Sequence, residues 1–306
     1  MRRGCSRSSG GRKIRSVRGG KFVAFAAEGP GTILIDEWQR RPESWDYVRR
    51  AVDGGAAPGR FLLTGSATPA AGTDTHSGAG RILSLRMRPL ALFERAGAEP
   101  SISMGALFAG GATITGETGA TLKHYIDAIA SGGFPGFYEA PPVPAWDMRR
   151  SPFAGLAKAP KHQLADPAFV LRLLDIPAAK LTGRFSYLLG PLFESLATLS
   201  VRVAAQASFG TVGHFRTVKG DREVDLIAQD QDGAIVAFEV KLAANIGDDD
   251  VKHLLWLREK LPDDVVDTVI LTTGTRAYRR RGRPPRPARC VGSAACSTAQ
   301  SGGTST

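Results

Sequence analysis

A short apolar run that ends in two acids constrains the fold of this chain more than any other feature. Residues 33–35 are Ile-Leu-Ile, preceded by a Gly-Pro-Gly turn and followed by Asp36 and Glu37. A run this short, bounded by turn residues, predicts a buried strand of a parallel sheet. A helical pattern follows over about 42–52, and residues 60–64 form a second apolar run. Strand, helix and strand together predict a right-handed βαβ unit.

The ends of these two strands carry side chains that suit phosphate chemistry. The carboxyl ends of parallel strands open onto the ligand crevice of such a sheet, so Asp36 is expected to hold Mg²⁺ through a water. Glu37 is then placed to orient or deprotonate an attacking water. Thr64 and Ser66 end the second strand and would lie beside a γ-phosphate, while Arg81 could reach a phosphate from a neighbouring subunit. An acidic helix cap after an ordinary strand stays open as the alternative.

Weaker patterns predict the rest of the first half and a boundary. Residues 81–95 predict a strand that turns at Pro89 into a short helix, and residues 121–130 predict a helix. From Phe137 onward the patterning disappears, and closely spaced prolines interrupt any regular element. We therefore expect residues 137–165 to be a Pro-rich junction between two domains.

The second half predicts a compact α/β domain. Its helical patterns lie at 167–174, 190–206 and 249–260, and its strand patterns lie at 211–217, 223–229, 234–243 and 265–273. The order of the core elements is therefore α-β-β-β-α-β.

Two acids and a lysine are expected to meet on one face of that second sheet. Glu239 and Lys241 are two positions apart on one strand, so their side chains point to the same face. Asp225 lies on the preceding strand and opposes Glu239 across a short turn. Two carboxylates and a lysine can bind Mg²⁺ and activate water for phosphodiester cleavage, and Glu194 on the preceding helix would add a third carboxylate. A solvated strand face with a Lys–Glu pair is the alternative.

The excess positive charge lies in the two ends of the chain. Residues 1–21 contain eight Lys and Arg, residues 276–306 contain seven, and neither stretch contains an acid. Removing those fifteen from the total leaves 25 basic against 29 acidic residues, so the body is mildly acidic although the chain carries +11. Such ends can bind nucleic-acid backbones nonspecifically. They are equally typical of disordered tails, which we expect at 1–21 and 279–306.

Other composition features bear on location. The three cysteines, Cys5, Cys290 and Cys296, are confined to the two ends and fit neither a disulfide framework nor a zinc site. The N-terminus lacks the apolar region of a signal peptide, and no run of 18 apolar residues occurs. We therefore expect a reduced, cytoplasmic protein that does not cross a membrane.

A longer series of motifs surrounds Asp36. It comprises Thr32–Gln39, Arg60–Pro69, His76–Arg81, Arg88–Glu94 and the Gly-Gly-Phe-Pro-Gly run at 132–136. This series resembles the bacterial and archaeal AAA-like ATPases that carry a C-terminal domain of unknown function numbered 4143. The resemblance implies a partial P-loop parallel-sheet domain over 22–136, which uses ATP and Mg²⁺ and forms oligomers. It also implies that Asp36 and Glu37 are the Walker B pair and that Ser66 or Thr64 is the sensor.

The second domain carries a resemblance of its own. Asp225 and the triplet Glu239-Val240-Lys241 match the motif of the PD-(D/E)XK nuclease fold residue by residue, and the α-β-β-β-α-β order fits it. This resemblance implies a small restriction-endonuclease-like α/β domain over 166–278. Asp225, Glu239 and Lys241 would be its catalytic residues, and Asp225, Glu239 and Glu194 its metal ligands.

One motif of the ATPase family does not occur. No Gly-x-x-x-x-Gly-Lys-[Ser/Thr] loop lies in residues 1–31, before the strand that ends at Asp36, and the glycines near Lys13 and Lys21 have the wrong spacing. We therefore expect a fragment, or a misread gene product, that cannot bind or hydrolyse ATP efficiently. The alternatives are a Mg²⁺-dependent nuclease or nucleic-acid-binding module in the second domain, and a non-catalytic interaction protein.

Overall fold

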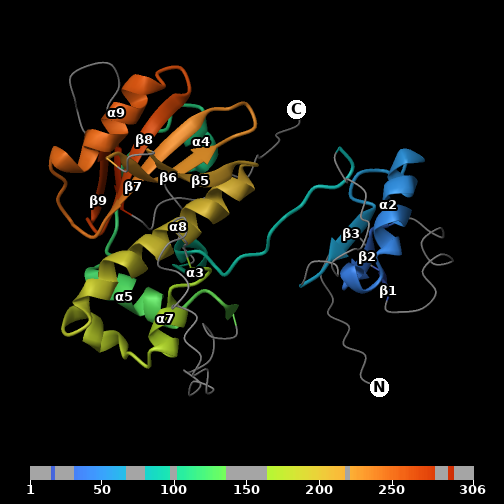
Figure 1. Ribbon diagram of the computed structural model, residues 1–306, viewed down its shortest axis with the longest axis horizontal. Helices are drawn as coiled ribbons and strands as arrows, with labels where there is room; N and C mark the ends of the chain where they lie inside the picture. The colour runs from blue at the N-terminus through green and yellow to red at the C-terminus, as the bar shows by residue number, and fades with distance from the viewer. Residues whose placement is uncertain are drawn as a thin grey trace. The chain divides into compact units, whose positions relative to one another are not determined.

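The computed structural model describes residues 15–17, 31–66, 80–96, 102–135, 164–217, 221–279 and 289–292. The chain forms two compact units, Met1–Arg86 and Met87–Thr306 (Figure 1). Each unit has its own sheet and its own hydrophobic core.

The first unit is built on the predicted strand-helix-strand segment. Its elements are β1 (Arg15–Val17), β2 (Ile33–Asp36), the 3-10 helix η1 (Trp38–Arg40), α2 (Glu43–Asp53) and β3 (Phe61–Thr64). The three strands are parallel and lie in the order β1-β2-β3. Ile33, Ile35 and Val48 are buried together, which packs α2 onto the sheet. The βαβ prediction is confirmed, with Asp36 directly opposite Thr64 at the carboxyl edge.

The strand predicted within 81–95 does not form. Residues 81–91 contain no strand, and only the short helix α3 (Leu92–Ala96) agrees with the prediction. Leu83, Leu85 and Met87 alternate as a strand would, yet they are 66%, 65% and 96% exposed. An extended segment needs a paired neighbour to satisfy its backbone groups, and no strand among the described residues pairs with this one.

The second unit contains a seven-stranded sheet. Its strands are β4 (Gly116–Glu117), β5 (Thr211–Arg216), β6 (Glu223–Gln229), β7 (Ile235–Lys241), β8 (Val265–Thr272), β9 (Arg276–Arg279) and β10 (Arg289–Gly292). They lie in the order β4-β9-β10-β8-β7-β6-β5. β6 is antiparallel to β5 and β7, whereas β7 is parallel to β8.

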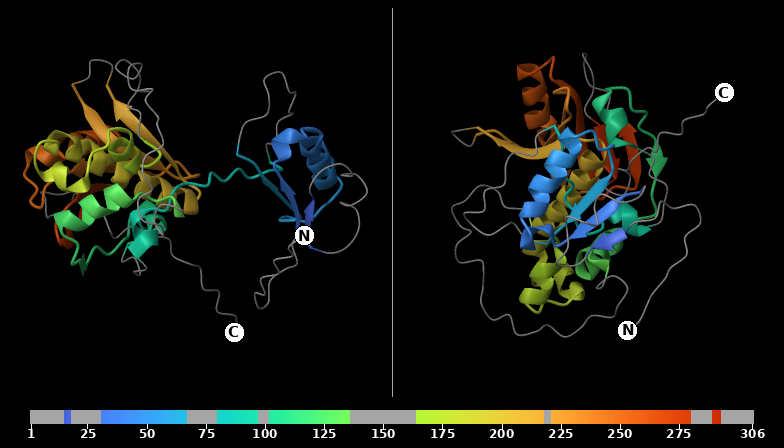
Figure 2. Two further views of the ribbon diagram at one scale, coloured as in Figure 1. Left: turned by 90° about the horizontal axis from the view of Figure 1, so that it is seen from below. Right: turned by 90° about the vertical axis from the view of Figure 1, so that its right-hand side faces the viewer.

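Helices cover both faces of this sheet. They are α4 (Met104–Phe108), α5 (Leu122–Ser131), α7 (Ala168–Leu173), η3 (Ala178–Thr182), η4 (Ser186–Leu188), α8 (Leu189–Ala207), η5 (Asp249–Val251) and α9 (Lys252–Lys260). One core cluster joins α4 and α8 to Phe238 of β7, and another joins α9 to Ala237 on the opposite face. Helices α8 and α9 thus lie on opposite sides of the sheet (Figure 2). The predicted order α8-β5-β6-β7-α9-β8 is confirmed.

Two short strands lie within ranges expected to be disordered tails. β1 pairs in parallel with β2, and β10 pairs in parallel with β8 and antiparallel with β9. Backbone pairing with a preformed strand edge needs no apolar pattern, so the charge-rich composition did not predict it. The rest of both tails, and almost all of the expected junction at 137–165, lies outside the described residues.

Hydrogen bonds at Gly133 and Asp166 join three segments of the second unit. The Gly133 N–H donates to Asp166 Oδ2 at 2.6 Å, and the Ala168 N–H donates to Asp166 Oδ1 at 2.9 Å. The Gly133 carbonyl accepts from the Leu90 N–H at 2.7 Å. Residues 87–135, which the sequence grouped with the ATPase-like segment, therefore pack with the second sheet in this structure.

Helix α8 is also the most apolar long helix that the structure describes. The stretch Ser186–Ala207 is long and apolar enough to cross a membrane, with a mean hydropathy of 1.3, but 67% of it is buried inside the fold. A buried core helix passes the same test of length and composition. Helix α8 contacts the core of the second unit.

Candidate functional site

A β-bulge between β5 and β6 changes the direction of the Asp225 side chain. Gly213 of β5 pairs with Ile227 of β6, but Phe215 pairs with Val224, so β6 carries one residue more than β5 between these pairs. An extra residue interrupts the alternation of side chains and turns one of them out of the regular pattern. Here Asp225 lies in the interrupted stretch. Its Oδ2 accepts a hydrogen bond of 2.9 Å from the Val240 N–H of β7.

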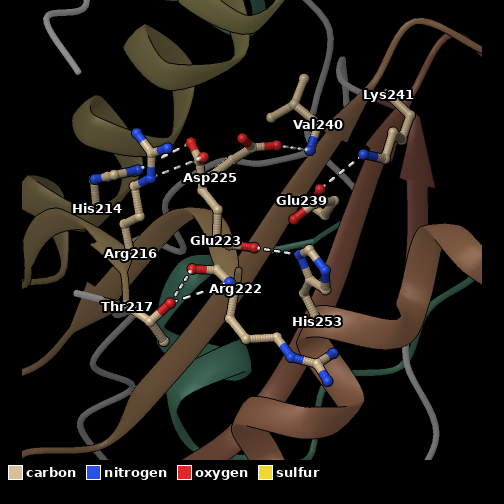
Figure 3. Close-up of polar contacts among 10 residues, drawn as sticks. All are labelled: His214, Arg216, Thr217, Arg222, Glu223, Asp225, Glu239, Val240, Lys241 and His253. Carbon is tan, nitrogen blue, oxygen red and sulfur yellow. Dashed lines mark hydrogen bonds and ion pairs between the residues drawn. The ribbon is translucent and has the colours of Figure 1, made fainter. Parts of the chain in front are cut away.

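Glu239 and Lys241 lie side by side on β7, on the same face of the sheet (Figure 3). The Lys241 ammonium donates to Glu239 Oε1 at 2.7 Å. Glu239 is only 8% exposed, and its other carboxylate oxygen, Oε2, is buried without a hydrogen-bond partner. The predicted meeting of Asp225, Glu239 and Lys241 is therefore found in the structure, with one acceptor left unsatisfied.

The surroundings of Glu239 disfavour its ionised form. Burial raises the pKa of Glu239 above its ordinary value of 4.5, and the negative charge of Asp225 raises it further. The hydrogen bond and charge of Lys241, together with His253, lower the pKa but do not offset the burial. The ion pair with Lys241 is therefore not enough to offset the cost of burying the Glu239 carboxylate in its charged form.

Lys241 is held in its charged form by the same carboxylates. Burial lowers the pKa of Lys241, but the hydrogen bond and charge of Glu239 outweigh it, with smaller help from Asp225 and Asp250. The net pKa is raised, so the lysine is an ammonium at neutral pH. A raised pKa suits a residue that stabilises negative charge rather than one that accepts a proton.

His253 belongs to this neighbourhood although its spacing in the sequence gave no sign of it. Its Nδ1 lies 2.8 Å from the Glu223 carbonyl, which can only accept, so Nδ1 donates the hydrogen bond. Figure 3 places the ring on α9 beneath Glu239. Only the packing of α9 against β6 brings His253 there, and no local motif encodes that contact.

Glu194 is not brought into a metal-binding group. Among the residues that the structure describes, no three Asp, Glu, His or Cys side chains come together in a geometry that could hold a metal ion. Glu194 lies half-buried on α8. The site around β7 therefore offers two protein carboxylates, those of Asp225 and Glu239.

The nucleotide-site residues of the first unit are partly assembled. Thr64 Oγ1 donates to Asp36 Oδ1 at 2.8 Å, and the Glu37 N–H donates to the same oxygen at 3.1 Å. Glu37 adopts the left-handed conformation with φ of 54°, which is strained for a residue with a side chain. Its carboxylate accepts from Gln39 Nε2 at 2.7 Å and lies 3.5 Å from Arg40 Nε.

Arg81 and Ser66 do not join that cluster in the single chain. Arg81 Nε donates to Asp53 Oδ1 at 2.6 Å, and Asp53 is the last residue of α2. In a βαβ unit the helix returns antiparallel to the strands, so its end lies at the edge opposite Asp36. Ser66 is exposed just beyond β3. Arg81 therefore holds the last residue of α2 in this chain.

Comparison with family models supports the two-part organisation. Residues 14–96 match a family described as an AAA domain, a segment that includes β1 and ends with α3. This segment of the chain is therefore similar to an AAA domain. Residues 189–290 match the domain of unknown function 4143, from the start of α8 into β10. The chain combines these two segments, which confirms the resemblance to AAA-like proteins that carry this domain. Comparison with curated proteins and with solved structures gives no match.

Proposed function

We propose that the second unit is a Mg²⁺-dependent phosphodiesterase module that acts on nucleic acid through Asp225, Glu239 and Lys241. The observation that carries this proposal is Glu239 Oε2, a carboxylate oxygen that is buried and has no hydrogen-bond partner. Leaving such an acceptor unsatisfied destabilises a fold by about 1–3 kcal/mol, and more when it is charged. A functional site gives a physical reason for retaining it.

A divalent cation fits the donors that are present. Two carboxylates with an excess of negative charge attract a cation, and Mg²⁺ commonly takes one or two protein carboxylates and fills its other positions with water and phosphate oxygens. Asp225 and Glu239 would hold the ion. The chemistry that a bound Mg²⁺ would supply is a coordinated water of lowered pKa and withdrawal of charge from the phosphate. The α-β-β-β-α-β order supports the restriction-endonuclease-like fold on which this chemistry is expected.

Each side chain then has a distinct role. The Val240 N–H holds Asp225 in place, so this carboxylate is oriented before any ligand arrives. The Lys241 ammonium fixes Glu239 through Oε1 and leaves Oε2 for the ion. Because Lys241 remains charged, it also stabilises the negative charge that develops on the phosphorane oxygens.

Nicking of supercoiled plasmid by the full chain in Mg²⁺ or Mn²⁺ tests the proposal. We expect activity in the wild type and none in Asp225→Asn or Lys241→Met, since each removes one member of the site. Lys252→Met is the matched control, because Lys252 is an exposed lysine that pairs with Asp249. Absence of metal-dependent nicking in the wild type, or equal nicking by all four proteins, would refute the assignment.

A second function is favoured by the Thr64–Asp36 hydrogen bond in the AAA segment. We propose that this edge retains weak affinity for Mg²⁺–ATP, with Asp36 holding the ion through a water and Glu37 facing the attacking water. Because the given sequence has no Gly-x-x-x-x-Gly-Lys-[Ser/Thr] motif, the affinity for ATP should be far weaker than in a complete site. Thr64 and Ser66 would contact the γ-phosphate.

Titration with a fluorescent ATP analogue measures this affinity. We expect no saturation below millimolar nucleotide, and any weak binding should require Mg²⁺ and disappear in Asp36→Ala. Asp46→Ala is the control, since Asp46 pairs with Arg49 on the outer part of α2. Micromolar binding lost in Asp36→Ala would mean that the edge is a competent site, and binding unchanged in Asp36→Ala would remove this second function.

A further inference from the structure

The segment just before α8 carries cations beside aromatic rings. Residues 176–193 contain Lys180 and Arg184 but no Asp or Glu. Phe185 and Tyr187 follow directly and lie on η4 and its flank. We call these four side chains the Lys180–Tyr187 surface.

The backbone of this surface is held in one conformation. The N–H groups of Gly183 and Phe185 both donate to the Lys180 carbonyl, at 3.2 and 3.1 Å. Phe185 is half-buried and packs, with Leu188, against the core cluster of α5, α7 and α8. A ring anchored in this way presents its neighbours to solvent with little loss of conformational entropy on binding.

The exposed groups are arranged for stacking and for phosphate. The Tyr187 side chain is 69% exposed, and its ring centroid lies 6.4 Å from that of Phe185. The Arg184 guanidinium lies 5.6 Å above the Phe185 ring. Lys180 and Arg184 have no ion pair with a carboxylate within the described ranges, whereas Lys252 and Arg216 do. Their charge is therefore available to an anionic partner.

We propose that the Lys180–Tyr187 surface binds single-stranded nucleic acid. Tyr187 stacks on a base, while Lys180 and Arg184 contact the flanking phosphates. Exposed aromatic rings beside cations are the usual way to bind a strand whose bases are not paired, since a duplex keeps its base faces stacked inside. An anionic lipid surface would use the cations but has no flat base for the ring.

The surface and the site on β7 belong to opposite faces of the sheet. Phe185 and Leu188 pack against the cluster on the α8 face, which Val240 also joins. Glu239 and Lys241 alternate with Val240 along β7 and therefore lie on the face that α9 covers. Binding at the Lys180–Tyr187 surface thus does not rest on the proposed function, since it requires neither metal nor cleavage.

Fluorescence anisotropy with a labelled oligothymidylate, measured on the full chain in EDTA, tests the proposal. We expect Tyr187→Leu to weaken binding about tenfold, because it removes one base–aromatic stack. Tyr187→Phe should bind as the wild type does, since it keeps the ring. Lys180→Ala and Arg184→Ala should each reduce the slope of log K against log salt by about 0.7. Arg50→Ala, an exposed arginine on α2, is the charge control.

The possible results separate the two proposals. Equal binding by wild type and Tyr187→Leu, or a preference for duplex over single strand, would refute the proposal that this surface binds single-stranded nucleic acid. Binding to anionic vesicles through the same residues, without binding to the oligonucleotide, would also overturn it. The expected binding pattern in a protein that never nicks plasmid would support the surface and refute the proposed phosphodiesterase activity alone.

Discussion

Replacing Asp166 with alanine is expected to lower the free energy of unfolding of the second unit by about 3 kcal/mol, because it leaves two buried donors, the Gly133 and Ala168 N–H groups, without an acceptor. Asp166 is 1% exposed, so water cannot replace the lost oxygens without opening the fold. Urea unfolding followed by far-ultraviolet circular dichroism measures the change. Asp166→Asn keeps one acceptor and should cause about half the loss.

The control is a carboxylate of the same kind on the surface. Asp127 forms an ion pair with Lys123 along α5 and is 54% exposed, so Asp127→Ala should change stability by no more than about 0.5 kcal/mol. Gly133→Ala provides an independent test of the same hydrogen-bonded contacts. An added Cβ would lie 2.9 Å from Leu90 N and closer still to Leu90 O, and both are backbone atoms that cannot move aside. If Asp166→Ala were no more destabilising than Asp127→Ala, the hydrogen bonds that Asp166 accepts from Gly133 and Ala168 would not stabilise the second unit.

The sequence predicted best where the structure depends on local pattern. Residues 33–35, 42–52 and 60–64 have the apolar spacing of a buried strand, an amphipathic helix and a second strand, and each forms as expected. The alternation of Glu239 and Lys241 also fixes their common face without any tertiary information. The local pattern of these segments predicts the type of element, but not every burial, because Leu62 of the second strand is 46% exposed.

Features set by pairing between distant residues were not predictable in this way. Leu83, Leu85 and Met87 alternate like a strand, but alternation cannot supply a neighbouring strand, so they remain exposed. β10 shows the reverse case: its composition favours a disordered tail, but its backbone pairs with β8. The bulge at Asp225 arises from the register between β5 and β6, which no single strand encodes.

The candidate sites show the same difference between contacts set by local pattern and contacts set by distant pairing. Asp36 and Thr64 meet because parallel pairing aligns the ends of two strands, which the sequence could state in advance. Arg81 pairs with Asp53 in the single chain, a contact between residues far apart in the sequence that no local pattern encodes. His253 reaches the Glu239 neighbourhood only through the packing of α9. Charged side chains on connecting segments have many possible partners, so their contacts depend on the whole fold.

Replacing Glu239 with glutamine is expected to abolish stabilisation of the fold by Mn²⁺ or Mg²⁺. In the wild type, an ion that binds only the folded state adds about 2.7 kcal/mol to the free energy of unfolding when its concentration is 100 times its Kd. Glutamine keeps the shape of Glu239 and an acceptor for Lys241, but it removes the charge that attracts the ion. Urea unfolding with and without Mn²⁺ measures the difference. Glu259→Gln, an exposed acid on α9, is the matched control and should keep the full metal effect.

Without metal, the same substitution should change how stability depends on pH. The folded protein raises the pKa of Glu239 above its ordinary value of 4.5, so it keeps this proton at pH values where the unfolded chain has lost it. The wild type therefore loses stability as pH rises from about 4.5 through the raised pKa, whereas Glu239→Gln has no such loss. At neutral pH the variant should be more stable by about 1 kcal/mol, since it no longer buries an unsatisfied charge. A variant that is less stable than the wild type at neutral pH, or one that Mn²⁺ stabilises equally, would show that Glu239 is a structural ion-pair partner of Lys241 and not a metal ligand.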